Sequence, residues 1–153
     1  MARGRETPIV SSVLDRLIQV ERHPTTYAAS VRALKESIRR DMEDLLNTRR
    51  SSAQVFAGYP LARASVVNYG LDDLSALKLA SGDGGMQAQR AVERCLAEYE
   101  PRLRDVHVEV LRSEATSREI RLHIKATIPI EPNAETVTFD SMLDLASGLY
   151  LVE

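Results

Sequence analysis

The sequence of 153 residues has few of the residues on which several folds and functions depend. Cys95 is its single cysteine, so an internal disulfide and a four-cysteine metal site are both excluded, and a reducing compartment is indicated. Tryptophan is absent and aromatic residues make up only 5% of the chain. Sugar-binding sites favour aromatic platforms, so this composition argues against such a site. No long apolar run follows Arg3 and Arg5, so we expect neither a signal peptide nor direct membrane insertion.

An excess of charge of one sign is also missing. The formal net charge of -2 gives no electrostatic reason to expect a nucleic acid or a membrane surface as the main partner. Hydrophobic residues at 44% and charged residues at 27% are typical of a globular protein. A chain of this length buries enough surface to fold around one core. We therefore expect a flexible N-terminus over residues 1–10 and a single cytoplasmic domain over residues 11–153.

Apolar residues spaced three and four apart predict two helices near the start of the chain. Ser11 or Ser12 can cap a short helix, because Asp15 follows Ser12 at the spacing of a capping box. Thr25 or Thr26 can cap a longer helix after the break at His23-Pro24. The short helix has Leu14, Leu17 and Ile18 on one face, and the long helix has Val31, Leu34, Ile38, Met42 and Leu45.

A weaker pattern follows between residues 51 and 83, where glycines and a proline indicate turns. We predict only a short helix there, near residues 73–79. A third helix is predicted over about residues 86–99, and Cys95 within it is predicted to fill the core rather than to act as a reactive thiol. The predicted buried face of this helix consists of Ala88, Val92, Cys95, Leu96 and Tyr99.

After Pro101 the apolar period changes to two, which predicts half-buried strands. Turns are predicted over residues 114–117, 131–134 and 147–148. The apolar positions are Val106, Val108 and Val110, then Ile120, Leu122, Ile124, Ala126, Ile128 and Ile130, then Val137, Phe139, Leu143 and Leu145, with a last strand over Leu149–Val152. The sequence thus predicts an α+β fold in which N-terminal helices pack on a C-terminal antiparallel β-sheet of three to four strands.

Many carboxylates raise the question of catalysis, because a glycosidase needs two of them on facing walls of a cleft, one in an apolar setting. The group Asp41, Glu43 and Asp44 shares a helix with two arginines, which is typical of a solvated face. Helix capping is the expected role of Asp72 and Asp73. We predict no catalytic residue and no enzymatic activity.

Cofactor and metal sites are not indicated either. His23 is predicted in a turn, whereas His107 and His123 fall on polar strand faces, so the three do not form a metal-binding set. Residues 82–85 lack the lysine and the serine or threonine of a phosphate-binding loop, and no serine occupies a nucleophile elbow. We expect no metal and no cofactor.

Four motifs, in order along the chain, resemble one family. They are "SSVLDRL" near the start, "RRDMEDLLNTRR" at the end of the long helix, "VVNYGLDDL" in the connection and "YEPRL" before the sheet. Together they resemble TssE, the baseplate component of bacterial type VI secretion systems, whose family includes a contractile phage wedge protein with a historical lysozyme label. The resemblance runs from about Ser11 to the final strand, and it departs at Asp72, where the family pattern has a proline.

This resemblance implies a structural subunit of a contractile injection machine, without enzymatic turnover. It implies a bridge between the helical bundle of other wedge subunits, of the TssF and TssG type, and the first layer of the tail sheath. The apparatus is anchored in a membrane, and the subunit itself would be cytoplasmic. The alternative function is a peptidoglycan-cleaving glycosidase, which only the historical label and the carboxylates favour.

The Glu-Pro-Arg motif of the family falls on Glu100, Pro101 and Arg102, and the resemblance implies that it meets the helical bundle. Pro101 disfavours helical geometry for Glu100, and the guanidinium of Arg102 can bind a carboxylate or several carbonyl groups, so a rigid turn would present both for docking. Alternatively, these side chains and Glu98 satisfy only one another and nearby backbone groups. We predict partner binding at this corner, and also at Arg49 and Arg50 after the long helix.

The predicted sheet has two edge strands, whose outward N–H and C=O groups can accept a partner strand. We hypothesise that the edge at Leu149–Val152, or the edge of the first strand, nucleates sheath assembly. The alternative is an edge that charge and twist protect.

Overall fold

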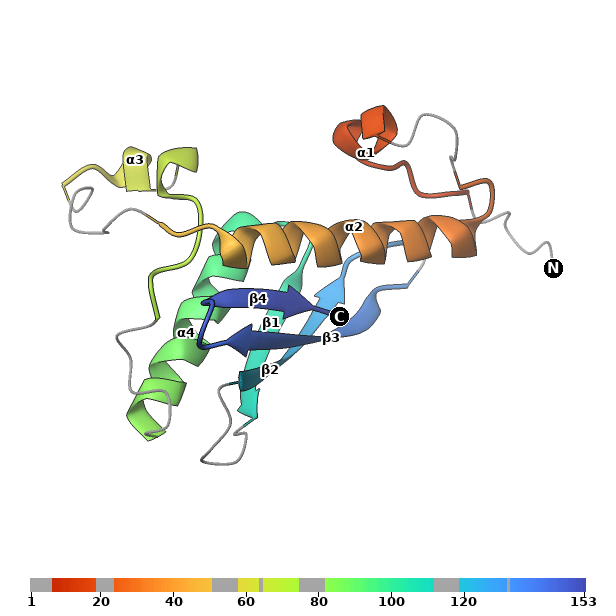
Figure 1. Cartoon of the computed structure of the whole chain (residues 1–153). Helices are drawn as coiled ribbons and strands as arrows, with labels where there is room; N and C mark the ends of the chain where they lie inside the picture. Colours follow the sequence, from red (N-terminus) through yellow and green to blue (C-terminus); the bar gives the residue numbers. More distant parts are fainter. Residues whose placement is uncertain are drawn as a thin grey trace. The chain divides into compact units, whose positions relative to one another are not determined.

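The computed structural model of the chain describes residues 7–18, 24–50, 58–63, 65–74, 82–111, 119–131 and 133–153 (Figure 1). It divides into two compact units, residues 1–41 and residues 42–153, and each is described by itself below. Helices precede a four-stranded antiparallel sheet, which confirms the predicted α+β class. The flexible stretch over residues 1–10 and the single domain over residues 11–153 stay predictions.

The first unit consists of α1 (Val13–Ile18) and most of α2 (Tyr27–Asn47). Both predicted caps are present. The hydroxyl of Ser12 accepts a hydrogen bond from the Asp15 N–H at 3.1 Å, and the hydroxyl of Thr26 accepts one from the Ala29 N–H at 3.2 Å. Each cap satisfies a donor that the first turn of a helix leaves unpaired.

A buried carboxylate links the two helices of the first unit. Asp15 is only 7% exposed, and its oxygens accept hydrogen bonds from Ser12 at 2.6 Å, Ser37 at 2.8 Å and Arg40 at 2.7 Å. The predicted apolar face of α1 is exposed instead, since Leu14, Leu17 and Ile18 are 59%, 69% and 61% exposed. Within this unit, α1 is therefore attached to α2 by polar contacts rather than by its apolar side chains.

The ionisation of Asp15 makes this link dependent on pH. Burial, the largest single effect, would raise its pKa, but the hydrogen bonds from Ser12, Arg40 and Ser37 and the charge of Arg40 together lower the pKa from 3.8 to about 2. Because the folded pKa lies below the unfolded value, the stabilisation is fully present above about pH 4 and is lost as the pH falls toward 2. This difference corresponds to about 2 kcal/mol at neutral pH.

We therefore expect α1 to separate from α2 between about pH 4 and pH 2. The chemical shifts of the Ser12 and Asp15 amides, followed by NMR during an acid titration, measure this change. An Asp15→Asn variant should already be loosened at pH 7 and should lose the acid transition. An unchanged transition in that variant would mean that another group controls the separation.

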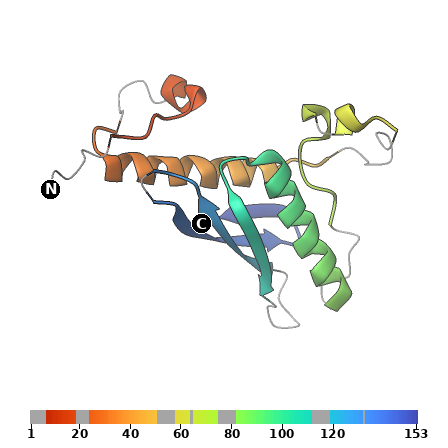
Figure 2. The same cartoon turned by 180° about the vertical axis from the view of Figure 1, so that it is seen from behind.

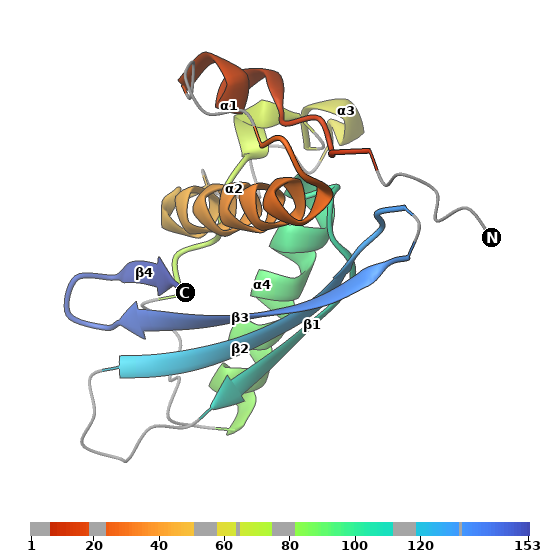
Figure 3. The same cartoon turned by 90° about the vertical axis from the view of Figure 1, so that its right-hand side faces the viewer.

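The second unit contains the end of α2, a connection with two short helices, the helix α4 and the sheet (Figure 2). The connection holds α3 (Pro60–Arg63) and the 3₁₀ helix η2 (Val66–Asn68), followed by α4 (Gly82–Tyr99). The strands are β1 (Arg104–Leu111), β2 (Glu119–Ile128), β3 (Glu135–Asp144) and β4 (Leu149–Val152). They lie in the order β1-β2-β3-β4, and each pairs antiparallel with the next, so β1 and β4 are the outer strands (Figure 3).

The alternation predicted for the strands is present, and it places every second side chain of β2 in the core. Leu122, Ile124, Ala126 and Ile128 of β2 are all at most 3% exposed, and each large side chain of this kind contributes about 1.5–3 kcal/mol on burial. The helix α4 packs beside β1 and buries its predicted apolar face, although Tyr99 keeps partial exposure. The other buried apolar side chains of this unit are Met42, Leu45, Leu46, Leu71, Leu74, Ala88, Val92, Cys95, Leu96, Leu103, Val108, Val137, Phe139, Leu143, Tyr150 and Val152.

Several predicted boundaries differ from the structure. The helix α4 begins at Gly82 rather than at residue 86, and α3 and η2 were not predicted. Asp73 and Leu74 are not helical, and residues 75–79 of the short helix predicted there lie outside the described residues, as do His23 and the turn over residues 114–117. Within the described residues, no helix is both long and apolar enough to cross a membrane.

Candidate docking site

The chain leaves α4 through a tight corner. The N–H of Glu100 still donates to the Leu96 carbonyl at 2.9 Å, and the Glu100 carbonyl accepts from the Leu103 N–H at 3.1 Å. Pro101 has no N–H and disfavours helical geometry for the residue before it, so the helix cannot continue. The corner is therefore fixed by its own backbone hydrogen bonds before any side chain is considered.

An ion pair occupies this corner. The Nε of Arg102 donates to Oε1 of Glu100 at 2.7 Å, and its terminal nitrogen donates to Oε2. The backbone N–H of Arg102 also donates to Oε1, at 3.2 Å. Two parallel bonds between a guanidinium and a carboxylate form the strongest common type of protein ion pair.

The two partners differ in exposure. The Glu100 side chain is 5% exposed, whereas the Arg102 side chain is 29% exposed. Burial turns the carboxylate inward, so Glu100 acts as an anchor that orients Arg102. The internal pairing weighed in the sequence analysis is thus present, and partner binding through the exposed part of Arg102 stays a prediction.

Residues 68–70 of the connection are attached to the last turns of α4. The Tyr99 hydroxyl donates to the Asn68 carbonyl at 2.9 Å, and the rings of Tyr69 and Tyr99 meet edge to face, with centroids 5.3 Å apart. The thiol of Cys95 donates to the Gly70 carbonyl at 3.3 Å, and burial raises the pKa of this thiol to about 12. Cys95 therefore stays protonated at neutral pH and serves packing, as its position in the helix predicted.

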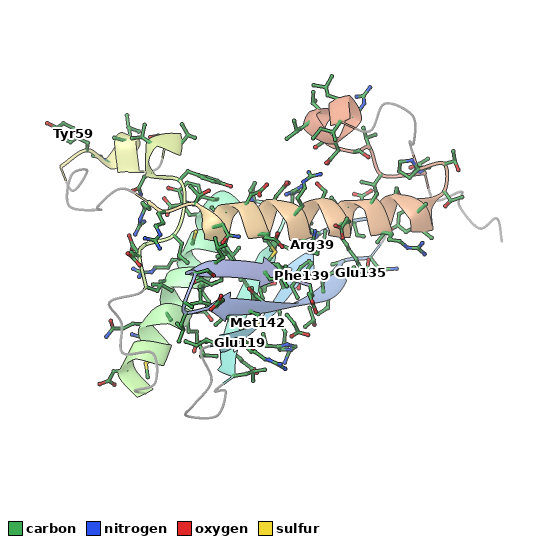
Figure 4. All side chains as sticks on the ribbon, in the orientation of Figure 1. Arg39, Tyr59, Glu119, Glu135, Phe139 and Met142 are labelled. Atoms are coloured by element: carbon green, nitrogen blue, oxygen red, sulfur yellow. The ribbon has the colours of Figure 1, made fainter. Side chains whose placement is uncertain are left out.

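Exposed apolar side chains lie in this same connection. Val66 and Val67 of η2 are 81% and 60% exposed, directly before Asn68, which bonds to Tyr99 next to the corner. Tyr59 and Leu61 are 68% and 88% exposed, and Figure 4 shows Tyr59 pointing outward at the tip of this segment. Large apolar side chains gathered on an exposed segment are typical of an interaction surface. We call Tyr59, Leu61, Val66 and Val67 the apolar tip.

The two arginines after α2 have different environments. Arg50 is bound by both oxygens of Asp72, with an Nε–Oδ1 distance of 2.8 Å, and this bond raises its pKa. Arg49 is 64% exposed at the side chain and has a long contact of 3.4 Å with Asp73. Asp72 and Asp73 thus bind arginines, and residues 75–79 of the helix that they were predicted to cap lie outside the described residues.

Backbone pairing brings these charges together. The Leu71 N–H donates to the Thr48 carbonyl at 2.8 Å, and the Arg50 N–H donates to the Leu71 carbonyl at 2.9 Å. The segment after α2 and the segment before α4 therefore lie side by side. A carboxylate at residue 72 pairs with Arg50 in a way that a proline at this position could not.

The carboxylates that line one groove of the second unit are bound to arginines or to a backbone N–H. Asp72, Asp73 and Glu93 line one groove, together with Arg90 and Arg94. Asp72 is bound to Arg50, and Glu93 accepts a hydrogen bond from the Val108 N–H at 2.9 Å. His123 lies 2.6 Å from Asp140, and no group of three or more metal-binding side chains occurs among the described residues.

Comparison with known proteins identifies the family. The sequence pattern of the family described as baseplate wedge protein gp25 matches residues 32–133. The chain belongs to this baseplate wedge family. A structural comparison matches a chain of a solved structure titled "The baseplate complex from the type VI secretion system", with 19% identity and a TM-score of 0.51, over 72% of this chain and 94% of that chain. A search of curated proteins found no match.

Membership of the baseplate wedge family confirms the resemblance predicted from the four motifs and gives the chain a structural role in a baseplate. The family match includes Arg49, Arg50 and the corner at Glu100, Pro101 and Arg102. Sequence reasoning missed the partners of Arg49 and Arg50, since nothing local marks Asp73 and Asp72 as their partners. It also missed Glu93, Glu43 and Asn47, whose side chains bind the backbone of the outer strands.

Proposed function

We propose that this wedge protein is a structural component of a type VI secretion baseplate that bridges the other wedge subunits and the first layer of the tail sheath, without catalytic turnover. It would act in the cytoplasm as part of a membrane-anchored apparatus. The observation that carries the proposal is the corner at Glu100, Pro101 and Arg102, where a buried carboxylate holds an arginine that is still 29% exposed.

The corner suits a helical bundle of TssF and TssG type as its partner. Arg102 is already oriented by two bonds to Glu100, so little side-chain entropy remains to be lost on docking. Its exposed surface can donate to carbonyl groups at the end of a partner helix. The apolar tip adds a surface that an apolar helix face would cover. Its residues Val66 and Val67 directly precede Asn68, whose carbonyl accepts a hydrogen bond from Tyr99 next to the corner.

Co-purification tests this proposal. The full chain, carrying an affinity tag, is expressed together with the other wedge subunits, and the composition of the purified complex is measured by gel filtration with light scattering. We expect one complex that contains the chain and its wedge partners. A chain that elutes alone at every concentration would argue against the bridging role.

A muramidase assay separates the structural role from the glycosidase alternative. We expect purified protein to release no soluble fragments from peptidoglycan, because the carboxylates of the groove are bound to Arg50 and to the Val108 N–H. Measured cleavage that Glu100→Gln abolishes would favour the glycosidase instead.

A further inference from the structure

A small pocket lies beside the turn between β3 and β4, and we call it the leucine pocket. Its volume is about 90 Å³, whereas sites for whole small molecules measure about 300–1,000 Å³. An apolar cavity of about 150 Å³ holds a benzene molecule, so the leucine pocket has room for one aliphatic side chain. Its apolar walls are Leu46 of α2, Leu71 and Leu74 of the connection, and Leu143, Leu145 and Leu149 around the β3–β4 turn.

The walls of the leucine pocket combine a buried floor with an exposed rim. Leu46, Leu71 and Leu143 are at most 6% exposed, and they form part of the core. Leu145 and Leu149 are 46% and 58% exposed. An aliphatic side chain that entered the pocket would remove part of this rim surface from water, and the hydrophobic effect would favour its binding.

Arg49 lies at the rim of the leucine pocket. Its nitrogen Nη2 is 3.1 Å from the place where a Cβ would stand at Gly148, so the missing side chain lets the guanidinium lie against the β3–β4 turn. Among the described residues, the one ion-pair contact of this side chain is with Asp73, at 3.4 Å. Asp73 has a further interaction of its own. The guanidinium, with a side chain that is 64% exposed, can therefore still donate to a carboxylate above the pocket.

Arg50 does not share this availability. Both oxygens of Asp72 bind its guanidinium, and its side chain is only 19% exposed. The same pairing neutralises the charge of Asp72, which lines the leucine pocket. Of the two arginines that the sequence predicted for partner binding, Arg49 is the one placed to meet an acidic group.

We propose that the leucine pocket binds a leucine side chain from an acidic peptide segment of another protein, and that Arg49 pairs with a carboxylate next to that leucine. The pocket volume admits one side chain, so the rest of the occupant lies outside it. A lysine beside the leucine would be repelled by Arg49. The inference goes beyond the proposed function, because the pocket shares no lining residue with the corner or the apolar tip.

NMR of the leucine methyl groups of the full chain tests the proposal, with the acetylated and amidated peptide Glu-Leu-Glu as the probe. We expect the methyl signals of Leu46, Leu71 and Leu143 to shift, with a Kd on the order of 1 mM, since one side chain and one exposed ion pair provide little affinity. The peptide Glu-Ala-Glu should bind at least about tenfold more weakly, because it buries less apolar surface. Lys-Leu-Lys should bind at least about tenfold more weakly through repulsion.

Two variants of the chain test the two halves of the site. Arg49→Gln removes an exposed charge and should weaken the binding of Glu-Leu-Glu by about fivefold or more. Leu145→Ser removes apolar surface from the rim and should also weaken it. Arg121→Gln is the matched control, because Arg121 is exposed on β2 and does not line the pocket, so this variant should bind as the wild type does. The amide spectrum of each variant shows that it is folded.

Four results would overturn the proposal, in whole or in part. If the methyl groups do not shift at peptide concentrations well above about 1 mM, the pocket is not a binding site. Contacts of these methyl groups with residues 75–81 in the free protein, measured by the nuclear Overhauser effect, would mean that the chain itself fills the pocket. Equal binding by Arg49→Gln would remove the role of Arg49, and tighter binding of Lys-Leu-Lys would assign recognition to Asp73 and a basic partner.

The peptide titration and the test of the proposed function have separate outcomes. The titration uses only this chain and a synthetic peptide, so its failure leaves the co-purification with wedge subunits unaffected. Conversely, a chain that elutes alone from the wedge subunits could still bind Glu-Leu-Glu in the leucine pocket.

Discussion

Replacing Arg102 with alanine should destabilise the protein by about 3 kcal/mol, because the Glu100 carboxylate, at 5% exposure, would be left buried without its partner. The backbone N–H of Arg102 still donates to Glu100 in the variant, so the loss should fall at the lower end of the range for broken buried pairs. Urea denaturation followed by circular dichroism measures the change. The same variant should fail to co-purify with the wedge subunits.

Because an unstable protein also fails to assemble, a paired variant is needed. Glu100→Gln combined with Arg102→Met removes both charges, so no buried charge is left alone, and most of the stability should return. We expect the paired variant to fold, but to bind the wedge subunits at least tenfold more weakly than the wild type does. Arg104→Ala, at an exposed position two residues further on, should have no effect. If the folded paired variant assembles like the wild type, the corner serves only the fold.

Replacing Gly70 with alanine should be at least as damaging. Gly70 has a φ of +114°, which side-chain-bearing residues rarely adopt, and a Cβ there would lie 2.3 Å from the carbonyl oxygen of Thr48. Thr48 also accepts the bond from Leu71 that aligns the two segments, so it cannot move away freely. We expect a loss of about 3 kcal/mol or more, from backbone strain together with the steric clash.

Gly58 provides the matched control for that prediction. Among the described residues, a Cβ at Gly58 would meet nothing within 4 Å, so Gly58→Ala should change stability by no more than about 0.5 kcal/mol. Thermal unfolding of both variants measures the difference. Equal melting temperatures would mean that the pairing of Thr48 with Leu71 contributes little to the fold.

The sequence predicted the sheet well because burial on one face imposes strict alternation. Leu122, Ile124 and Ile128 are buried as the period of two required, and Ser12 and Thr26 cap the helices for which they were expected. The start of α4 was missed because glycines 82, 84 and 85 indicate a turn locally, although the helix includes them. The exposure of Leu14 and Leu17 was also not predictable, since spacing shows which side chains share a face but not whether another element covers it.

The candidate docking site was predicted only in part. The proline and its charged neighbours marked the corner, because helix termination leaves a local signal. The bonds between Arg50 and Asp72, between Glu93 and the Val108 N–H, and between Asn47 and Tyr150 join residues distant in the chain. Such pairs have no periodicity, so the fold had to be known before they could be found. They also show that β4, a candidate edge for partner strands, is already occupied.

The most direct test of the bridging role is a three-component binding measurement. Purified wild-type protein is mixed with wedge subunits and tail sheath subunits, and the molecular mass of the complex is measured by gel filtration with light scattering. The bridging role predicts one particle that contains all three components, and that forms only when this protein is present. Particles that contain the protein with either partner but never with both, or a three-component particle that assembles equally well without it, would contradict the bridge.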